Sequence, residues 1–228
     1  MEVGKRTVNM TFERVDFDNV VGFHPRLDEN YQYKQPQQRE DKWLTSTLEE
    51  ETTHFTRIYD LVKDIINEKY KDIHSLLIVK NNKLVLEEYF YGYSADDLNG
   101  IQSASKSFWS ALLGIAFQQG AIKDINQSIC PYVGKWDDKQ ILPKSWVAEA
   151  TTKQISTGGQ DNEGYGYFWW TRSFKREGKA IDYYYAWGYG GQYIFVVPEM
   201  NMVVVFTGSS WKMNDPTYFE IMDNYLIE

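Results

Sequence analysis

Apolar residues recur with two different periods along the first half of the chain. From Thr53 to Tyr70 they follow the repeat of an amphipathic helix, and Ser46 to Glu50 just before it resembles a helix start. Residues 75–80 form a short apolar run that predicts a strand. Asn81-Asn82 then predicts a tight turn, and Lys83 to Tyr91 predicts the returning strand of a hairpin.

In the second half of the chain the pattern of apolar residues predicts helices and several strands. Ser103 to Gly120 is apolar nearly all round, which predicts a buried helix that ends at a glycine suited to a C-terminal cap. Pro143 lies near the start of a short predicted helix, and a terminal helix is expected over 215–226. Strands are predicted over 180–188, 192–197 and 202–207, with a turn at 198–201.

This order of elements predicts an α+β fold. Hairpin-length turns favour an antiparallel five-stranded sheet, flanked by N- and C-terminal helices and by the buried helix at 103–120. Residues 1–47 are polar with little periodicity and predict an extended N-terminal arm. Residues 48–228 are expected to form one domain, as their number suggests.

Composition and charge argue against several classes of function. A net charge of −8 without any run of Lys or Arg disfavours nucleic acid and anionic membranes as partners. The single cysteine, Cys130, excludes an internal disulfide, no cluster of His, Glu or Asp has metal-ligand spacing, and no cofactor is expected. Met1 to Met10 contains no apolar signal segment and no run reaches transmembrane length, so we expect a cytoplasmic protein, or an exported one if a leader has been removed.

The helix predicted from residue 103 begins with Ser103-Ala104-Ser105-Lys106. A serine and a lysine three residues apart lie on one face of a helix, so the hydroxyl lies beside a possible base. A serine needs such a base to become a nucleophile, and a lysine serves as one when burial or a nearby cation lowers its pKa. The spacing alone is not specific, because Ser209 to Lys212 repeats it after a strand-like run.

Other arrangements of nucleophile and base are not visible in the sequence. The Gly-x-Ser-x-Gly pattern of the α/β-hydrolases is absent. His24, His54 and His74 are scattered along the chain, and structural or solvent-exposed roles are expected for all three. The residues therefore give no sign of a Ser-His-Asp arrangement.

Six segments carry a resemblance to a known family, and they are 73–93, 101–108, 121–125, 134–143, 165–170 and 188–192. In this order they resemble the penicillin-recognising serine hydrolases, in the branch that contains class C β-lactamases, D-alanyl-D-alanine carboxypeptidases and related esterases. The segment at 101–108 is similar to the active-site segment of that family. The resemblance extends over most of the chain from about Leu48 onward.

The resemblance implies roles for individual residues. Ser103 is implied to be the acylated nucleophile and Lys106 its proton acceptor, and the backbone N–H groups of Ser103 and Tyr189 are implied to form the oxyanion hole. A plain hairpin turn is an equally weighted interpretation of Gly188 to Gly191. The residues expected to contact a substrate are Trp187, Gly188, Tyr165 and Tyr167.

The chain departs from this family at two motifs. It contains neither Tyr-x-Asn nor Ser-x-Asn, and the helical subdomain that carries this motif is expected to be missing, with a junction at 132–134. Tyr165 and Tyr167 are weak replacements, since a tyrosine base needs a strongly lowered pKa. Ala186-Trp187-Gly188 stands in place of the third motif, Lys-Thr-Gly or His-x-Gly, so the cationic or imidazole group is missing as well.

Loss of the subdomain has a physical consequence for the helix at 103–120. An apolar face of that helix is expected to meet water, which predicts homo-oligomers formed through this face. The residues concerned are Phe108, Trp109, Leu112 and Phe117.

Two functions follow from these observations. The first is a serine hydrolase that acts on small esters or amides through an acyl-enzyme, with β-lactamase activity not expected. The alternative is a catalytically impaired or inactive member of the family, which serves as a ligand-binding or structural scaffold.

Overall fold

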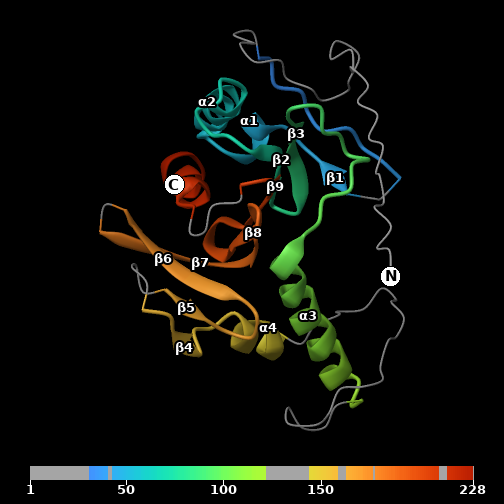
Figure 1. Cartoon of the computed structure of the whole chain (residues 1–228), viewed down its shortest axis with the longest axis vertical. Helices are drawn as coiled ribbons and strands as arrows, with labels where there is room; N and C mark the ends of the chain where they lie inside the picture. The colour runs from blue at the N-terminus through green and yellow to red at the C-terminus, as the bar shows by residue number, and fades with distance from the viewer. Residues whose placement is uncertain are drawn as a thin grey trace, which may run out of the picture.

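The computed structural model describes residues 31–40, 43–121, 144–158, 163–176, 178–210 and 215–227. Its centre is a nine-stranded sheet in the order β1-β3-β2-β9-β8-β7-β6-β5-β4 (Figure 1). Neighbouring strands are antiparallel except β1 and β3, which run parallel. The strands are β1 (Leu44–Thr45), β2 (Ile73–Lys80), β3 (Lys83–Tyr89), β4 (Ile155–Ser156), β5 (Gly164–Tyr165), β6 (Trp170–Arg176), β7 (Lys179–Gly188), β8 (Gln192–Val197) and β9 (Met202–Gly208).

The α+β class is confirmed, and the five-stranded antiparallel sheet is wrong. The five predicted strands are present as the contiguous antiparallel centre of the sheet, β3-β2-β9-β8-β7. Four further strands extend this centre, and β1 adds one parallel pair. The turn between β2 and β3 is as predicted, with Asn81 and Asn82 at φ of 49° and 62°, the backbone that a two-residue hairpin turn needs.

The largest element missing from the sequence prediction is β6. Its core-facing positions include Arg172 between Trp170 and Phe174, and a charged residue there conceals the alternation of a half-buried strand. The fold accommodates this charge because the Arg172 guanidinium lies 4.5 Å from the centre of the Phe219 ring, a cation–π contact. This contact joins residues far apart in the sequence, so the local pattern of β6 does not reveal it.

One face of the sheet carries the main core. The amphipathic helix predicted at 53–70 is confirmed as α2 and packs on this face together with the C-terminal helix (Figure 1). Side chains on β7 and β8 alternate, so that Tyr185 and Phe195 enter the core. The helices are α1 (Leu48–Glu51), α2 (Phe55–Ile66), α3 (Ser105–Gln118), α4 (Lys144–Ala150) and α5 (Thr217–Ile221), which continues as one π-helical turn (Met222–Leu226); short 3₁₀ turns cover Gln102–Ala104 and Pro198–Met200.

The prediction that the 103–120 helix is buried is wrong. The residues of α3 that are buried are Ser107, Ser110 and Gly114, which share one face of the helix. The expected exposure of the apolar side is confirmed for Phe108, Trp109 and Leu112, which are 52%, 61% and 45% exposed. Phe117 is instead half-buried, and its ring stacks on Trp146 of α4 at 5.6 Å. Small residues thus face the rest of the molecule and large ones face outward.

Several predictions concern residues outside the described ranges. These are the first 30 residues of the predicted arm, His24, Cys130, the segments 122–125 and 134–143, the junction at 132–134, and Trp211-Lys212. The described end of the arm lies on the sheet, where the Tyr31 hydroxyl donates to Glu88 Oε1 at 2.7 Å. The boundary at residue 47 stays a prediction. Among the described residues, no helix is long and apolar enough to cross a membrane.

Candidate functional site

The structure brings Ser103 and Lys106 together at the start of α3. Ser103 lies in the 3₁₀ turn Gln102–Ala104, which leads directly into the helix. Lys106 Nζ lies 3.2 Å from Ser103 Oγ, and both side chains are exposed. The spacing of three residues therefore gives the proximity that the sequence predicted. The hydroxyl also lies at the N-terminal end of a 14-residue helix, where exposed N–H groups favour negative charge.

The residue before Ser103 adopts an unusual backbone conformation. Gln102 has a φ of 48°, in the left-handed region that residues with a side chain rarely occupy. The Ser105 hydroxyl donates to the Gln102 carbonyl at 2.8 Å and so supports the turn from within. Backbone strain of this kind persists only where surrounding contacts enforce it, and it gathers at active sites and ligand clamps.

The end of β7 packs directly against this turn. A Cβ placed on Gly188 would lie 2.3 Å from the Ile101 carbonyl oxygen and 3.0 Å from the Ala104 nitrogen. Only glycine permits so close an approach of two backbones. The approach brings the chain at Gly188 beside the turn that carries Ser103.

The tyrosines expected to contact substrate have other partners. The Tyr167 hydroxyl donates to Glu149 Oε1 at 2.9 Å, and this hydrogen bond raises the pKa of Tyr167. Burial raises the pKa of Tyr165, whose ring packs edge-on against Trp170 at 4.8 Å. Both shifts oppose the lowered pKa that a tyrosine base requires. Substrate contact by either residue stays a prediction.

Trp187 lies on the other face of β7 from Gly188, because successive side chains of a strand alternate. Its ring packs against Trp170 at 5.9 Å and stacks on Tyr193 at 6.4 Å, next to the main core. The structure thus separates the Trp187 side chain from the face that meets Ser103. Its substrate role stays a prediction.

Two contacts that the sequence analysis did not identify hold α3 in place. The Ser107 hydroxyl donates to the Phe168 carbonyl at 2.6 Å, and Trp146 Nε1 donates to the Ser110 carbonyl at 3.2 Å. Phe168, in the turn between β5 and β6, has a φ of 64° and is 40% exposed. These contacts join residues distant in sequence, so no local pattern signals them.

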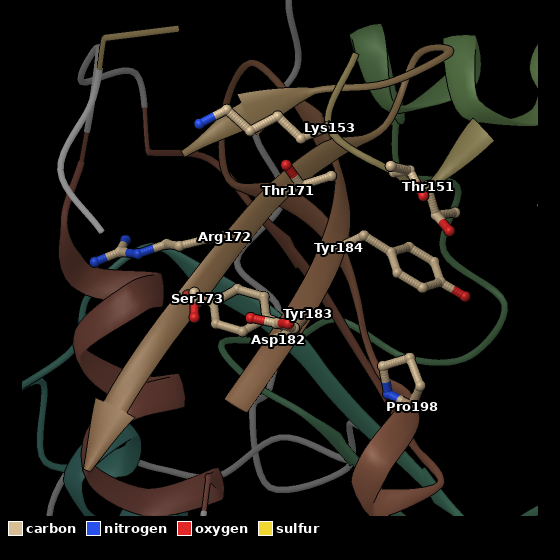
Figure 2. A pocket seen from close by; sticks show the side chains of 10 residues that line it. Thr151, Lys153, Thr171, Arg172, Ser173, Asp182, Tyr183, Tyr184 and Pro198 are labelled. Atoms are coloured by element: carbon tan, nitrogen blue, oxygen red, sulfur yellow. The ribbon is translucent and has the colours of Figure 1, made fainter. Parts of the chain in front are cut away.

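A separate polar cavity of about 330 Å³ lies beside β6 and β7. Figure 2 shows the side chains that line it. Thr171, Ser173 and Tyr184 contribute to its lining from one face of the sheet, and Thr151 lies opposite, after α4. Ser103 and Lys106 are not part of this lining. Within the described ranges, no group of three or more His, Cys, Asp or Glu residues could hold a metal ion.

His74 has a structural role, one of the two roles expected for it from the sequence. It lies inside β2, and its buried imidazole joins Asn99 and Ser209. These three residues are far apart in the sequence, and no spacing pattern connects them. They are taken up in the further inference below.

Comparison with known proteins supports the fold. The sequence matches no protein-family model and no curated protein. A solved structure described as a 6-aminohexanoate-dimer hydrolase from Bacillus anthracis is similar over 75% of this chain and 80% of its own, with 14% sequence identity and a TM-score of 0.51. An octameric penicillin-binding protein homologue from Pyrococcus abyssi aligns over 68% of this chain and 30% of its own, with 19% identity and a TM-score of 0.28. The first similarity shows that this chain shares the fold of the Bacillus protein.

Proposed function

We propose that this protein is a serine hydrolase that forms an acyl-enzyme on Ser103. The observation that carries the proposal is the 3.2 Å approach of Lys106 Nζ to Ser103 Oγ at the N-terminal turn of α3. The close packing of Gly188 against that turn gives further support. The fold shared with a protein described as a hydrolase agrees with this proposal.

The proposed reaction has two halves. Ser103 Oγ attacks the carbonyl carbon of an ester or amide while its proton moves to Lys106 Nζ, and the same proton then passes to the leaving alcohol or amine as its bond to the carbonyl carbon breaks. In the second half, water attacks the acyl carbon, gives a proton to Lys106 and releases the acid. Ser103 recovers its proton, so atoms and charge balance over the cycle.

The negative oxygen formed in each half needs hydrogen-bond donors. The backbone N–H groups of Ser103 and Tyr189 are proposed for this role, since the chain at Gly188 lies against the Ser103 turn. The N-terminal end of α3 adds favourable potential at the same place. Removal of one oxyanion donor in other enzymes costs about 10²–10³ in rate.

The substrates proposed are small esters or amides. Ser103 and Lys106 are both exposed, and the Tyr165 and Tyr167 pKa shifts argue against a replacement base. Turnover is therefore expected to be slow. The same exposure supports the alternative of a ligand-binding or structural scaffold that retains the fold without catalysis. The 6-aminohexanoate dimer named for the Bacillus protein is one substrate to test.

The deciding experiment is reaction with a fluorophosphonate, followed by intact-mass analysis and peptide mapping. We expect one adduct on Ser103 that is absent from Ser103→Ala. Lys106→Ala should slow labelling by about 10²–10⁴-fold, the usual contribution of a general base. Gly188→Ala should also slow labelling, because the new Cβ would collide with the Ile101 carbonyl. Ser94→Ala removes a hydroxyl that bonds Asp97 and serves as a matched control that labels normally.

The result separates the two functions. No adduct on Ser103 in protein that retains its cooperative thermal unfolding would exclude an activated nucleophile and leave the scaffold. An adduct whose rate is unchanged in Lys106→Ala would refute the lysine base alone. Incubation with a penicillin in parallel tests whether the site is acylated by a β-lactam, for which no turnover is expected.

We also propose that the protein forms homo-oligomers through the outer side of α3. Phe108 and Leu112 are neighbours one turn apart on the helix, and Trp109 lies beside them. All three are exposed. Adjacent large apolar side chains in water commonly mark an interface.

A further inference from the structure

A β-bulge sets the direction of the His74 side chain. Ile73 pairs with Gly208 and Ser75 pairs with Thr207, so the ladder between β2 and β9 passes over His74. The carbonyl of His74 still accepts a hydrogen bond from the Phe90 backbone N–H at 2.8 Å. Bulges redirect single side chains and are frequent next to active sites. Here the bulge places the imidazole near the end of β9, within reach of Ser209.

The imidazole joins a serine and an asparagine in one hydrogen-bonded chain. His74 Nδ1 lies 3.0 Å from Asn99 Oδ1, and His74 Nε2 lies 2.9 Å from Ser209 Oγ. An amide oxygen only accepts, so Nδ1 carries the proton. In the neutral ring Nε2 then accepts from the Ser209 hydroxyl. This is the order of nucleophile, base and orienting group found in serine and cysteine hydrolases.

Tyr93 stacks on the imidazole, and burial favours its neutral form. Tyr93 stacks on its ring with centres 3.7 Å apart and planes 11° apart. Burial lowers the pKa of His74, although the Asn99 hydrogen bond and the charge of Asp72 act in the opposite direction. A neutral, fixed imidazole is the form that removes a proton from a hydroxyl.

His74 and Ser209 line a cavity of about 360 Å³. A cavity of this size is typical of sites for small molecules. Three other lining residues, Glu68, Asp72 and Tyr91, have left-handed φ values of 60°, 64° and 57°. Strained backbone gathered around one cavity is a feature of ligand and catalytic sites.

We propose that Ser209, His74 and Asn99 form a second acyl-transfer site, separate from Ser103, that accepts small carboxylic esters. Ser209 Oγ attacks the ester carbonyl as its proton moves to His74 Nε2, and the proton then passes to the leaving alcohol as the ester C–O bond breaks. Asn99 keeps Nδ1 protonated and so holds Nε2 free to accept. Water hydrolyses the acyl-serine by the same route in reverse.

The neighbourhood of Ser209 limits how fast this site reacts. The backbone N–H of Ser209 donates to the Asp72 carbonyl at 2.8 Å, so it is not available to a developing oxyanion. Lys71 is the only lysine among the residues that line this cavity. The site is therefore suited to activated esters with good leaving groups, for which weak oxyanion stabilisation suffices.

The test uses p-nitrophenyl acetate with the full chain in a Ser103→Ala background, which silences the first site. Release of p-nitrophenolate is followed in real time, and acid-quenched samples are mapped for acetyl-serine. We expect release that depends on Ser209, together with acetyl-Ser209 if hydrolysis is the slower step. Ser209→Ala should abolish both signals. His74→Gln should lower the rate by about 10²–10⁴-fold.

Ser75→Ala is the matched control. It removes a hydroxyl from the same pair of strands that is bonded to Thr207 Oγ1 at 2.7 Å, so the rate should be unchanged. Release at the same rate in Ser209→Ala, or no release from folded Ser103→Ala protein, would overturn the proposal. So would a rate that His74→Gln leaves unaltered. None of these results bears on Ser103, whose labelling is measured separately.

Discussion

Two helices of similar length and apolar content pack on opposite faces of the sheet, and they use their apolar residues in different ways. In α2 the apolar positions repeat at helical spacing, and Leu61, Ile65 and Ile66 are fully buried. In α3 apolar residues occur all round, and the buried positions are held by small residues such as Ser107 and Gly114. Apolar content alone therefore does not decide burial, whereas the spacing of apolar positions does.

The difference matches what each helix provides. The α2 helix closes the main core and supplies stability. The α3 helix brings the Ser103 turn against Gly188, and small residues on its inner face allow this approach. Its large side chains remain outside, available to a partner.

The largest expected effect is the loss of stability when one leucine in each helix is shortened. Leu61→Ala should lower the free energy of unfolding by about 2–5 kcal/mol, because it leaves a cavity in a packed core. Leu112→Ala in α3 should change it by about 0.5 kcal/mol or less, since that side chain is 45% exposed. Urea unfolding followed by circular dichroism measures both. Equal losses would show that α3 is as fully packed as α2.

A smaller effect is expected on association. Replacing Phe108 and Trp109 by serine should weaken self-association by about tenfold or more, since truncation of a large aromatic side chain in an interface commonly costs over 1 kcal/mol. Sedimentation velocity over a range of concentrations measures the change. Leu98→Ser is the control, because Leu98 is fully exposed but lies outside α3. A wild-type protein that stays monomeric at the highest concentration would contradict the proposed interface.

The smallest effect concerns pH and the buried His74. Because burial lowers its pKa, the unfolded chain binds a proton more readily than the folded one as pH falls below about 6.5, and stability declines there. At higher pH both states are neutral and the effect vanishes. Glu68, Lys71 and Asp72 line the same cavity and add their own charges to this balance.

Thermal unfolding at pH 7.5 and at pH 5.5 measures this contribution. His74→Gln should reduce the loss of melting temperature between the two pH values. An identical pH dependence in wild type and His74→Gln would mean that this imidazole does not contribute.

Local patterns determined much of the fold. The hairpin of β2 and β3 was predictable because Asn81-Asn82 tolerates the left-handed backbone of its turn. The α2 helix was predictable because its spacing selects one face. The pairing of Ser103 with Lys106 also follows from local geometry, since three residues make almost one helical turn.

The tertiary structure decided what local spacing cannot express. Whether the large or the small side of α3 faces inward depends on its neighbours, since apolar residues occur on every side. The strand β6 depends on the Phe219 ring that receives Arg172. The chain of Ser209, His74 and Asn99 joins residues separated by 135 and 25 positions. The register between β2 and β9 and the course of the loop before Ser103 bring these three together, and both are set by packing across the sheet rather than by adjacent residues.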